Sequence, residues 1–449
     1  MMRSMFSGVS GLKVHQTRMD VIGNNIANVN TAGYKSQRVT FSDVFSQTLS
    51  SATSANDDTG RGGMNAMQVG LGVNVSSIDM LMTQGAAQRT DNPFDLMING
   101  DGFMVVADAT GRYFTRSGAL RLDDEGNLVN PNGMKVQGWL ATDNGNGEYE
   151  INSQEVQDIN LFDPKYQSMN PDITTKAQIT GNVCSTSEKE TFSVAAYDSL
   201  GNYYTIPLVI EQDATTKGKW SITIAETGKK GTTGKGTYVT DAKGELYPIT
   251  ASGAIEVQFD KDGKLTSVTG TLGSSSSGGS TGTSTSSMEF GLNLSGITNL
   301  PGGGTLSDVT VDLSSITQYA TKSTIEGKET NGNSAGTLSG YSIGKDGIIN
   351  VNYTNGEQRK IAQVVVANFD NPAGLEKVGD NLYLATTNSG EFDGIGDAGN
   401  FSTGVLEMSN VDLSAEFTDM IITQRGFQAN SRIITVSDEM LQELTNLKR

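Results

Sequence analysis

Apolar side chains recur at helical spacing most strongly at the two ends of this 449-residue chain. In the first 30 residues one apolar position returns every seven residues, which predicts an amphipathic helix with one adhesive stripe. The repeat consists of Met5, Leu12, Met19 and Ile26, with Phe6, Val9, Ile22 and Val29 beside it. Asn30 and Gly33 favour a turn, so we expect this helix to end close to residue 30.

The last 37 residues, 413–449, repeat the pattern more strictly. Its five successive heptad positions are Leu413, Met420, Phe427, Ile434 and Leu441, flanked by Phe417, Ile421, Leu444 and Leu447. Asp412 or Ser414 is expected to cap the start of this helix. Two helices alone cannot bury both stripes well, so packing against neighbouring copies competes with ordinary packing inside one subunit.

Between the two helices the pattern changes to that of β-strands. Residues 103–107 and 113–122 are alternately or continuously apolar and are bounded by turn sequences. Strands around 348–353 and 360–368 flank Asn355-Gly356, which is a strong hairpin signal. Residues 273–287 contain only Gly, Ser and Thr, which predicts a mobile surface loop.

The chain is therefore predicted to be an α+β protein, mainly β, with nested domains. We expect the N- and C-terminal α-helices to pair as a coiled-coil-like core, with β-rich domains in the middle of the chain. The predicted division joins 1–30 with 408–449 as a helical polymerisation domain, 31–90 with 393–407 as a connecting segment, and 91–140 with 336–392 as an inner β domain. Residues 141–335 form the predicted outer, variable β domain.

Charge narrows the choice of partners. The chain holds 32 basic and 50 acidic residues, a net charge of −18, which argues against nucleic acid or an anionic membrane as the main partner. Residues 1–30 carry three basic and one acidic side chain, and residues 413–449 carry four and five. An acidic middle between nearly neutral ends suits a body that faces water and ends that face protein.

Composition also limits the chemistry. With one cysteine, Cys184, and one histidine, His15, we expect no metal, cofactor or catalytic residues. No stretch of about 20 apolar residues is present, so no membrane insertion is expected. The apolar residues of the N-terminal segment are spaced rather than continuous, unlike those of a cleavable signal peptide. Composition alone would place the chain in the cytoplasm.

Several stretches resemble the axial proteins of the bacterial flagellum. The string GNNIANVNTAGYKS, residues 23–36, is similar to the N-terminal signature shared by rod, hook and hook-associated subunits. Residues 91–106 and 113–139 resemble the inner β domain of rod and hook proteins. Residues 360–390 resemble the returning half of that domain in hook proteins, and residues 407–449 resemble the hook C-terminus almost throughout. The chain is accordingly identified as a member of the rod and hook family, and most resembles its hook proteins.

The resemblance implies a non-enzymatic structural subunit of the hook, a curved flexible tube that links rod to filament and transmits torque. It also implies export through the flagellar type III apparatus without signal cleavage, and an extracellular location. The implied partners are copies of the chain, the distal rod protein, the hook cap protein and the hook–filament junction protein. The expected polymerisation interface consists of Met5, Leu12, Met19, Ile22, Ile26, Leu413, Phe417, Met420, Phe427, Ile434 and Leu441.

Two shorter features carry predictions of their own. Phe41 and Phe45, in FSDVF, resemble the family's export-gate recognition pattern, an ordinary buried strand or helix turn being the alternative. The hook proteins of some bacteria carry intersubunit lysinoalanine links between a cysteine and a lysine. Cys184 lies in the part of the chain where such a cysteine is expected, with Lys165 or Lys176 as partner, the alternative being a small buried residue.

Other classes of protein fit the sequence less well. A distal-rod protein is the nearest alternative, although rod subunits are expected to be shorter and to lack a large insert; a hook-associated structural protein follows. A secreted β-rich enzyme that acts on sugars would need stacking aromatic residues, and aromatic residues make up only 7 % of the chain. A β-rich adhesin would not need matched heptads at both ends.

Overall fold

The computed structural model describes residues 2–54, 62–144, 149–214, 216, 218–228, 235–249, 253–270, 272–273, 288–294, 297, 300–329 and 331–447. From residue 274 onward, the predicted mobile loop lies outside these described residues. The chain divides into two compact units. Unit 1 is built from residues 1–163, 341–350 and 359–449, and unit 2 from residues 164–340 and 351–358. Both ends of the chain therefore belong to one unit.

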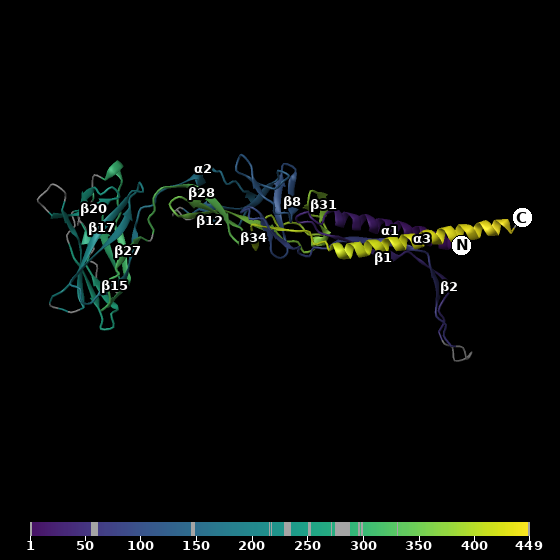
Figure 1. Cartoon of the computed structure of the whole chain (residues 1–449), viewed down its shortest axis with the longest axis horizontal. Helices are drawn as coiled ribbons and strands as arrows, with labels where there is room; N and C mark the ends of the chain where they lie inside the picture. The colour runs from purple at the N-terminus through teal and green to yellow at the C-terminus, as the bar shows by residue number, and fades with distance from the viewer. Residues whose placement is uncertain are drawn as a thin grey trace. The chain divides into compact units, whose positions relative to one another are not determined.

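Unit 1 contains two long helices, α1 (Met2–Ala27) and α3 (Leu413–Asn446), which lie side by side (Figure 1). α1 gives way to a turn in which Gly33 has a φ of 72°. A Cβ at Gly33 would lie 2.7 Å from the backbone nitrogen of Ser117, so glycine is required there for two reasons. The Asp412 carboxylate caps α3 by accepting a hydrogen bond from the Ser414 N–H at 2.9 Å. The cap predicted at Asp412 is confirmed.

The strands of unit 1 come from both halves of the chain. The earlier strands are β1 (Gln37–Asp43), β2 (Ser46–Ser50), β3 (Met67–Gly70), β4 (Val73–Met80), β5 (Ala87–Arg89), β6 (Leu96–Ile98), β7 (Phe103–Asp108), β8 (Gly111–Thr115), β9 (Arg121–Leu122), β10 (Leu128–Val129), β11 (Lys135–Asp143), β12 (Tyr149–Ile151) and β13 (Gln157–Asp158). The returning elements are β30 (Gln358–Ala367), the short helix η3 (Pro372–Gly374), β31 (Glu376–Gly379), β32 (Leu382–Leu384), β33 (Asp397–Ala398), β34 (Phe401–Thr403) and β35 (Val405–Glu407).

The main sheet of unit 1 interleaves these halves. Its strands follow the order β30-β11-β7-β8-β32-β31, so returning strands pair with strands from the first 143 residues. The buried core beneath it includes Phe103, Phe114, Trp139, Val365 and Tyr383. Because two distant stretches of sequence complete one core, neither stretch can form it alone.

Unit 2 is a two-layer β structure around one apolar core. One sheet has the order β24-β25-β26-β15-β27, and the other has the order β19-β20-β17-β18-β22-β23 with β16 and β21 attached. The core holds Trp220, Tyr204 and many β-branched side chains. Its elements are α2 (Pro164–Gln167), β14 (Ser168–Met169), β15 (Lys176–Cys184), β16 (Lys189–Tyr197), β17 (Tyr203–Gln212), β18 (Lys219–Ile224), β19 (Glu226–Gly228), β20 (Lys235–Asp241), β21 (Leu246–Pro248), β22 (Ile255–Phe259), β23 (Leu265–Thr269), β24 (Leu272–Gly273), β25 (Glu289–Asn293), η2 (Pro301–Gly303), β26 (Val309–Tyr319) and β27 (Glu326–Glu329).

The predicted fold class is confirmed: the chain is mainly β, with paired terminal helices and a nested organisation. β28 (Gly336–Ile343) and β29 (Ile348–Tyr353) lie where the chain passes between the units, and the turn predicted at Asn355-Gly356 follows β29. Unit 2 begins at residue 164, and β12 and β13 belong to unit 1, where both pair with β11. The finer four-part division stays a prediction. In the described part of the chain, no helix has the length and apolar character needed to cross a membrane.

Candidate assembly surface

The two terminal helices run antiparallel, as a ladder of contacts shows. At one end the Asn25 amide donates to the Glu416 carboxylate at 2.9 Å, and Arg18 pairs with Asp419 at 2.9 Å. Farther along, Gly426 lies against the His15 ring and Gly11 against the Asn430 side chain. Contacts at lower residue numbers in α1 thus lie at higher residue numbers in α3, so the two helices are antiparallel. We call the line of contact between them the seam.

Small and polar residues line much of the α3 side of this seam, and Ile434 lies against Gly8. Thr423 and Ser437 are buried, and their hydroxyls donate to carbonyls one turn earlier in α3 at 2.7 Å. A Cβ added to Gly426 would lie only 2.7 Å from the His15 ring. The seam positions Glu416, Asp419, Thr423, Gly426, Asn430 and Ser437 recur at intervals of three, four or seven residues, the spacing of a coiled-coil seam. The helices approach closely because these side chains are short or turn back on their own helix.

The structure divides the predicted polymerisation residues into two groups. Ile22 is buried, and seven others are half-buried, namely Met5, Leu12, Met19, Ile26, Met420, Ile434 and Leu441. Leu413, Phe417 and Phe427 are exposed. In the predicted α3 heptad, Met420, Ile434 and Leu441 are therefore partly covered, whereas Leu413 and Phe427 face outward.

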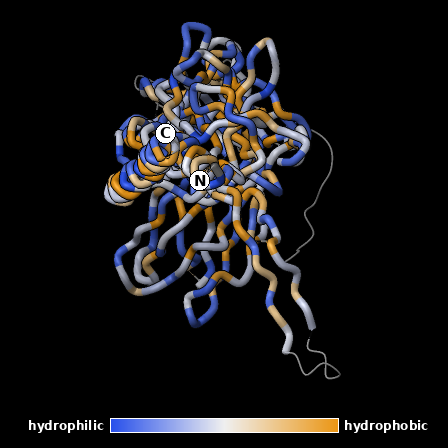
Figure 2. Tube along the Cα trace, turned by 90° about the vertical axis from the view of Figure 1, so that its right-hand side faces the viewer, coloured by the Kyte–Doolittle hydropathy of each residue, from blue (hydrophilic) through white to orange (hydrophobic). Residues whose placement is uncertain are grey.

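Further exposed apolar side chains extend this outward face. They are Phe6 and Val9 on α1, and Ile421, Ile422, Ile433, Val436, Met440, Leu444 and Leu447 on α3. Figure 2 shows hydrophobic and hydrophilic segments alternating along α3 near the C-terminus. Together with Leu413, Phe417 and Phe427, these residues form what we call the outer face of the helix pair. Large apolar side chains that stay exposed in this number, on helices that are already paired, mark an interaction site.

A buried ion cluster joins the base of the helices to the β body. The Lys35 ammonium lies 2.7 Å from the Glu407 carboxylate, and the Arg116 guanidinium lies 3.4 Å from its second oxygen. Lys35 also donates to the Thr83 carbonyl, and the Gly85 N–H donates to Glu407. Burial lowers the pKa of Lys35, and the hydrogen bond from Lys35 to Glu407 opposes that shift. Sequence reasoning missed this cluster, although Lys35 belongs to the GYKS signature.

A second polar cluster sits at the C-terminal end of α1. The Asn25 side chain is buried, accepts from the Tyr34 hydroxyl at 3.2 Å, and donates to the Gln37 carbonyl as well as to Glu416. Burial raises the pKa of Glu416, against the effect of its hydrogen bond from Asn25. These contacts fix the turn that follows α1 against the start of α3.

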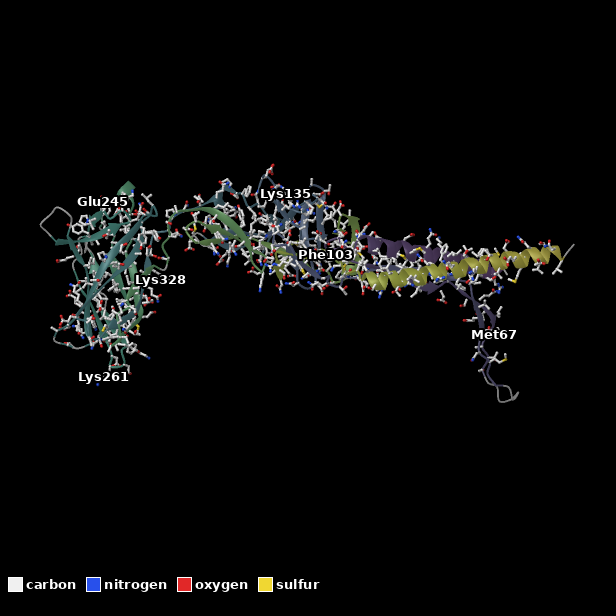
Figure 3. All side chains as sticks on the ribbon, in the orientation of Figure 1. Met67, Phe103, Lys135, Glu245, Lys261 and Lys328 are labelled. Carbon is white, nitrogen blue, oxygen red and sulfur yellow. The ribbon has the colours of Figure 1, made fainter. Side chains whose placement is uncertain are left out.

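The export candidates Phe41 and Phe45 lie near the α1 seam and the hairpin that follows. Phe41, in β1, packs edge-on to His15 with ring centres 6.3 Å apart, and Arg18 lies 5.7 Å from its ring centre. Phe45 precedes β2 and is 72 % exposed. The hairpin of β2 and β3 also exposes Leu49 and Met67, the latter labelled in Figure 3. Phe45 is therefore accessible, whereas Phe41 is partly covered by α1.

The crosslink candidates lie in unit 2. Cys184 ends β15 and is half-buried rather than buried, because Val183 takes the inward position beside it. Its sulfur lies 3.1 Å from the Thr186 hydroxyl, a hydrogen bond that lowers the thiol pKa. Lys176 begins the same nine-residue strand, about 26 Å away at 3.3 Å per residue, and Lys165 lies in α2 beside the Tyr166 ring. Cys184 and Lys176 of one chain are too far apart to be linked to each other.

The order of the helical and β-rich parts along the chain matches that of proteins of the flagellar basal body and hook. Four family descriptions match successive parts of the chain. They are "Flagella basal body rod protein" over 5–35, "Flagellar hook protein FlgE/F/G D1 domain" over 97–182, "Flagellar basal body protein FlaE D2 domain" over 170–333, and "Flagellar basal body rod FlgEFG protein C-terminal" over 402–447.

Full-length relatives are more specific. Flagellar hook protein FlgE is 37 % identical in Borreliella burgdorferi and 39 % identical in Treponema pallidum, with all of both chains covered in each comparison. The chain belongs to the flagellar hook protein FlgE family and is a structural subunit of the hook. The Bacillus subtilis protein named flagellar basal-body rod protein FlgG is 28 % identical, also over all of both chains. The expectation that rod subunits are shorter does not hold for this relative, since both chains are covered in full. The assignment to the hook proteins rests instead on the higher identity to the two FlgE relatives.

Proposed function

We propose that the chain assembles with copies of itself through the outer face of the helix pair. The observation that supports this is that twelve large apolar side chains of α1 and α3 stay exposed although the two helices are already paired. Transfer of one such side chain from water to a protein interior is worth about 1.5–3 kcal/mol. Even partial burial against neighbouring copies therefore gives a strong driving force for polymerisation.

Within the predicted interface, the proposal assigns two tasks. Leu413, Phe417 and Phe427 contact neighbouring copies, since they are exposed. The buried and half-buried residues, namely Met5, Leu12, Met19, Ile22, Ile26, Met420, Ile434 and Leu441, pack the helices of one subunit together. The first group governs assembly, and the second governs the stability of the subunit.

We further propose that the resulting polymer is the curved, flexible tube of the hook, which transmits torque from rod to filament. The helix pairs hold neighbours firmly through apolar contacts, while the acidic, polar surfaces of the β units adhere weakly and change contacts as the tube bends. The distal rod protein, the hook cap protein and the hook–filament junction protein are the expected neighbours at its ends. The role is structural, and we infer no enzymatic activity.

Export is proposed to use the flagellar type III apparatus without cleavage of a signal, with Phe41 and Phe45 as recognition residues. Once outside the cell, neighbouring subunits are proposed to be joined by a lysinoalanine link, as in the hook proteins of some bacteria. In this chain the link would connect Cys184 of one copy to Lys165 or Lys176 of another. Cys184 is half-buried, which supports that proposal more than the alternative of a small buried residue.

Removal of residues 413–449 tests the assembly proposal. The shortened chain is expected to keep the folded β core of unit 2 and to remain unpolymerised, as measured by circular dichroism, sedimentation and electron microscopy. Removal of residues 274–287, which contain only Gly, Ser and Thr, is the matched control and should leave polymerisation unchanged. Tubes formed by the chain without α3 would contradict the proposal.

A further inference from the structure

The C-terminal end of α3 projects beyond its partner helix. α3 has 34 residues and α1 has 26, and Gly8 of α1 lies against Ile434 of α3. Counted back along the antiparallel seam, the first residue of α1 stands opposite about residue 440 of α3. The last turns of α3 thus have no α1 residue beside them, and Figure 1 shows this end of α3 reaching past the N-terminus.

This projecting end carries an apolar groove with an acidic edge. Val436, Met440, Leu444 and Leu447 lie three or four residues apart and so form one stripe. Glu439 and Glu443 complete the lining of the groove. Neither glutamate belongs to an ion pair among the described residues. The groove therefore offers apolar contact and two carboxylates to whatever covers it.

The exposed side of α1 has the complementary character. Phe6 is 66 % exposed and Val9 is 54 % exposed, and they lie on one side of the helix between Arg3 and Lys13. Both basic side chains are exposed, and within the described part of the chain neither forms an ion pair. This side of α1 is an apolar patch with a cation at each end.

We propose that the projecting end of α3 in one copy receives the Arg3–Lys13 side of α1 in a neighbouring copy. The inference rests on the proposed self-assembly and specifies one of its contacts. At the centre of this contact, Phe6 and Val9 of one copy pack against the apolar stripe of α3 in the other. At its edge, the cations Arg3 and Lys13 lie beside the carboxylates of Glu439 and Glu443. Because the two surfaces differ, each copy can keep one surface free for a further neighbour, and the contact then repeats along an open helical polymer where its rotation does not close a ring.

The dimensions of the two surfaces are compatible. Arg3 and Lys13 are ten residues apart, about 15 Å along a helix, whereas Glu439 and Glu443 are about 6 Å apart. The long, flexible stems of Arg and Lys cover the difference by bending inward over the apolar centre. The same side chains shield Phe6 and Val9 from water once the contact forms.

Charge reversal on each side tests the contact. We compare the full-length chain with two double variants, Arg3→Glu with Lys13→Glu and Glu439→Lys with Glu443→Lys, and with the chain that carries all four changes. Each double variant should raise the concentration at which polymer appears in sedimentation by about tenfold at low salt, because attraction becomes repulsion. The fourfold variant should return to within about twofold of the unaltered chain. Lys243→Glu with Lys261→Glu, which reverses two exposed charges of unit 2, should polymerise normally.

The outcomes separate the contact from the wider proposal. Double variants that polymerise like the unaltered chain would overturn this contact and leave self-assembly standing. A fourfold variant no better than the doubles would show that these charges do not face one another, which also overturns it. An unaltered chain that stays monomeric at every concentration would contradict self-assembly and this contact together.

Discussion

Lys35 and Glu407, separated by 372 positions in the chain, form a fully buried ion pair with 2.7 Å between ammonium and carboxylate. Their side chains are 1 % and 0 % exposed, and Arg116 is the third member of the cluster. The Glu407 carboxylate thus pairs with two cations. Lys35 comes from the N-terminal signature, Arg116 from the β body, and Glu407 from the returning part of the chain. Loss of that carboxylate leaves two buried charges of the same sign.

We therefore predict that Glu407→Gln is more damaging than Lys35→Met. Breaking a buried pair costs about 3–5 kcal/mol when one charge is left uncompensated, and Glu407→Gln leaves two. Lys35→Met leaves the Arg116–Glu407 pair intact. Hydrogen exchange of residues 28–40 and 400–412 should rise strongly for the first variant and less for the second. The exposed Arg89–Asp91 pair is the control, and Arg89→Met should change little. Equal effects of the two cluster variants would count against this reasoning.

Acid should loosen the helix seam through His15. Burial, helped by Arg18, lowers the pKa of this imidazole below its ordinary value of about 6.5. The unfolded state therefore binds the proton more readily, and stability is lost as pH falls from 6.5 toward the folded pKa. Hydrogen exchange within residues 8–22 should be faster at pH 5.5 than at pH 7.5.

In His15→Gln the extra exchange at pH 5.5 should disappear. The raised pKa of Glu416 acts in the opposite sense, because protonation of that carboxyl favours the folded state as pH falls through the raised value. Glu416 is present in both chains, so the difference between His15→Gln and the unaltered chain isolates the contribution of the histidine. An acid response that persists without the histidine would refute its assignment to His15.

Two glycines of the helix pair should respond oppositely to alanine. Gly23 has open space around it, so Gly23→Ala should gain up to about 1 kcal/mol from helix propensity. At Gly426 the new Cβ would lie 2.7 Å from the His15 ring, so Gly426→Ala should lose about 1–3 kcal/mol through overpacking. Thermal unfolding followed by circular dichroism measures both. A stabilised Gly426→Ala chain would show that the seam is looser than described.

Phe45 gives the cleaner test of export recognition. Phe41→Ala also removes the contacts with His15 and Arg18, whereas Phe45 is largely exposed. Phe45→Ala should reduce secretion several-fold while thermal stability stays unchanged, and Phe41→Ala with Phe45→Ala should reduce it further. Leu49→Ala, an exposed apolar change in the same hairpin, is the control. Normal secretion of the chain without both phenylalanines would rule out the assignment.

The lysinoalanine proposal predicts covalent ladders. A link forms when Cys184 loses H₂S to give dehydroalanine and a lysine Nζ adds to the double bond. Isolated hooks should then run as multimers on denaturing gels, and Cys184→Ser should run as monomer. Comparison of Lys165→Arg with Lys176→Arg identifies the partner, since arginine keeps the charge and lacks the amine. Fully dissociated monomer from unaltered hooks would exclude the link.

The sequence predicted correctly those features that depend on a few neighbouring residues. The heptads located both terminal helices, Asn30 and Gly33 marked the turn after α1, Asp412 capped α3, and Asn355-Gly356 marked a turn. Each signal depends on the conformational preference of a few neighbouring residues. The boundary of unit 2 was less predictable, because β12 and β13 join unit 1 only through pairing with β11.

The paired ends of the chain were determined by the sequence: two amphipathic helices, nearly neutral, at either end of an acidic β body. Only the tertiary structure decided which side of each helix faces inward. An apolar repeat shows which side of a helix favours contact, but it does not show whether that side meets the other helix or a different surface. Close approach at Gly8, Gly11 and Gly426 fixes the rotation of the helices and turns Phe417 and Phe427 outward. Likewise, Lys35, Arg116 and Glu407 share a site because folding brings together segments that no local pattern connects.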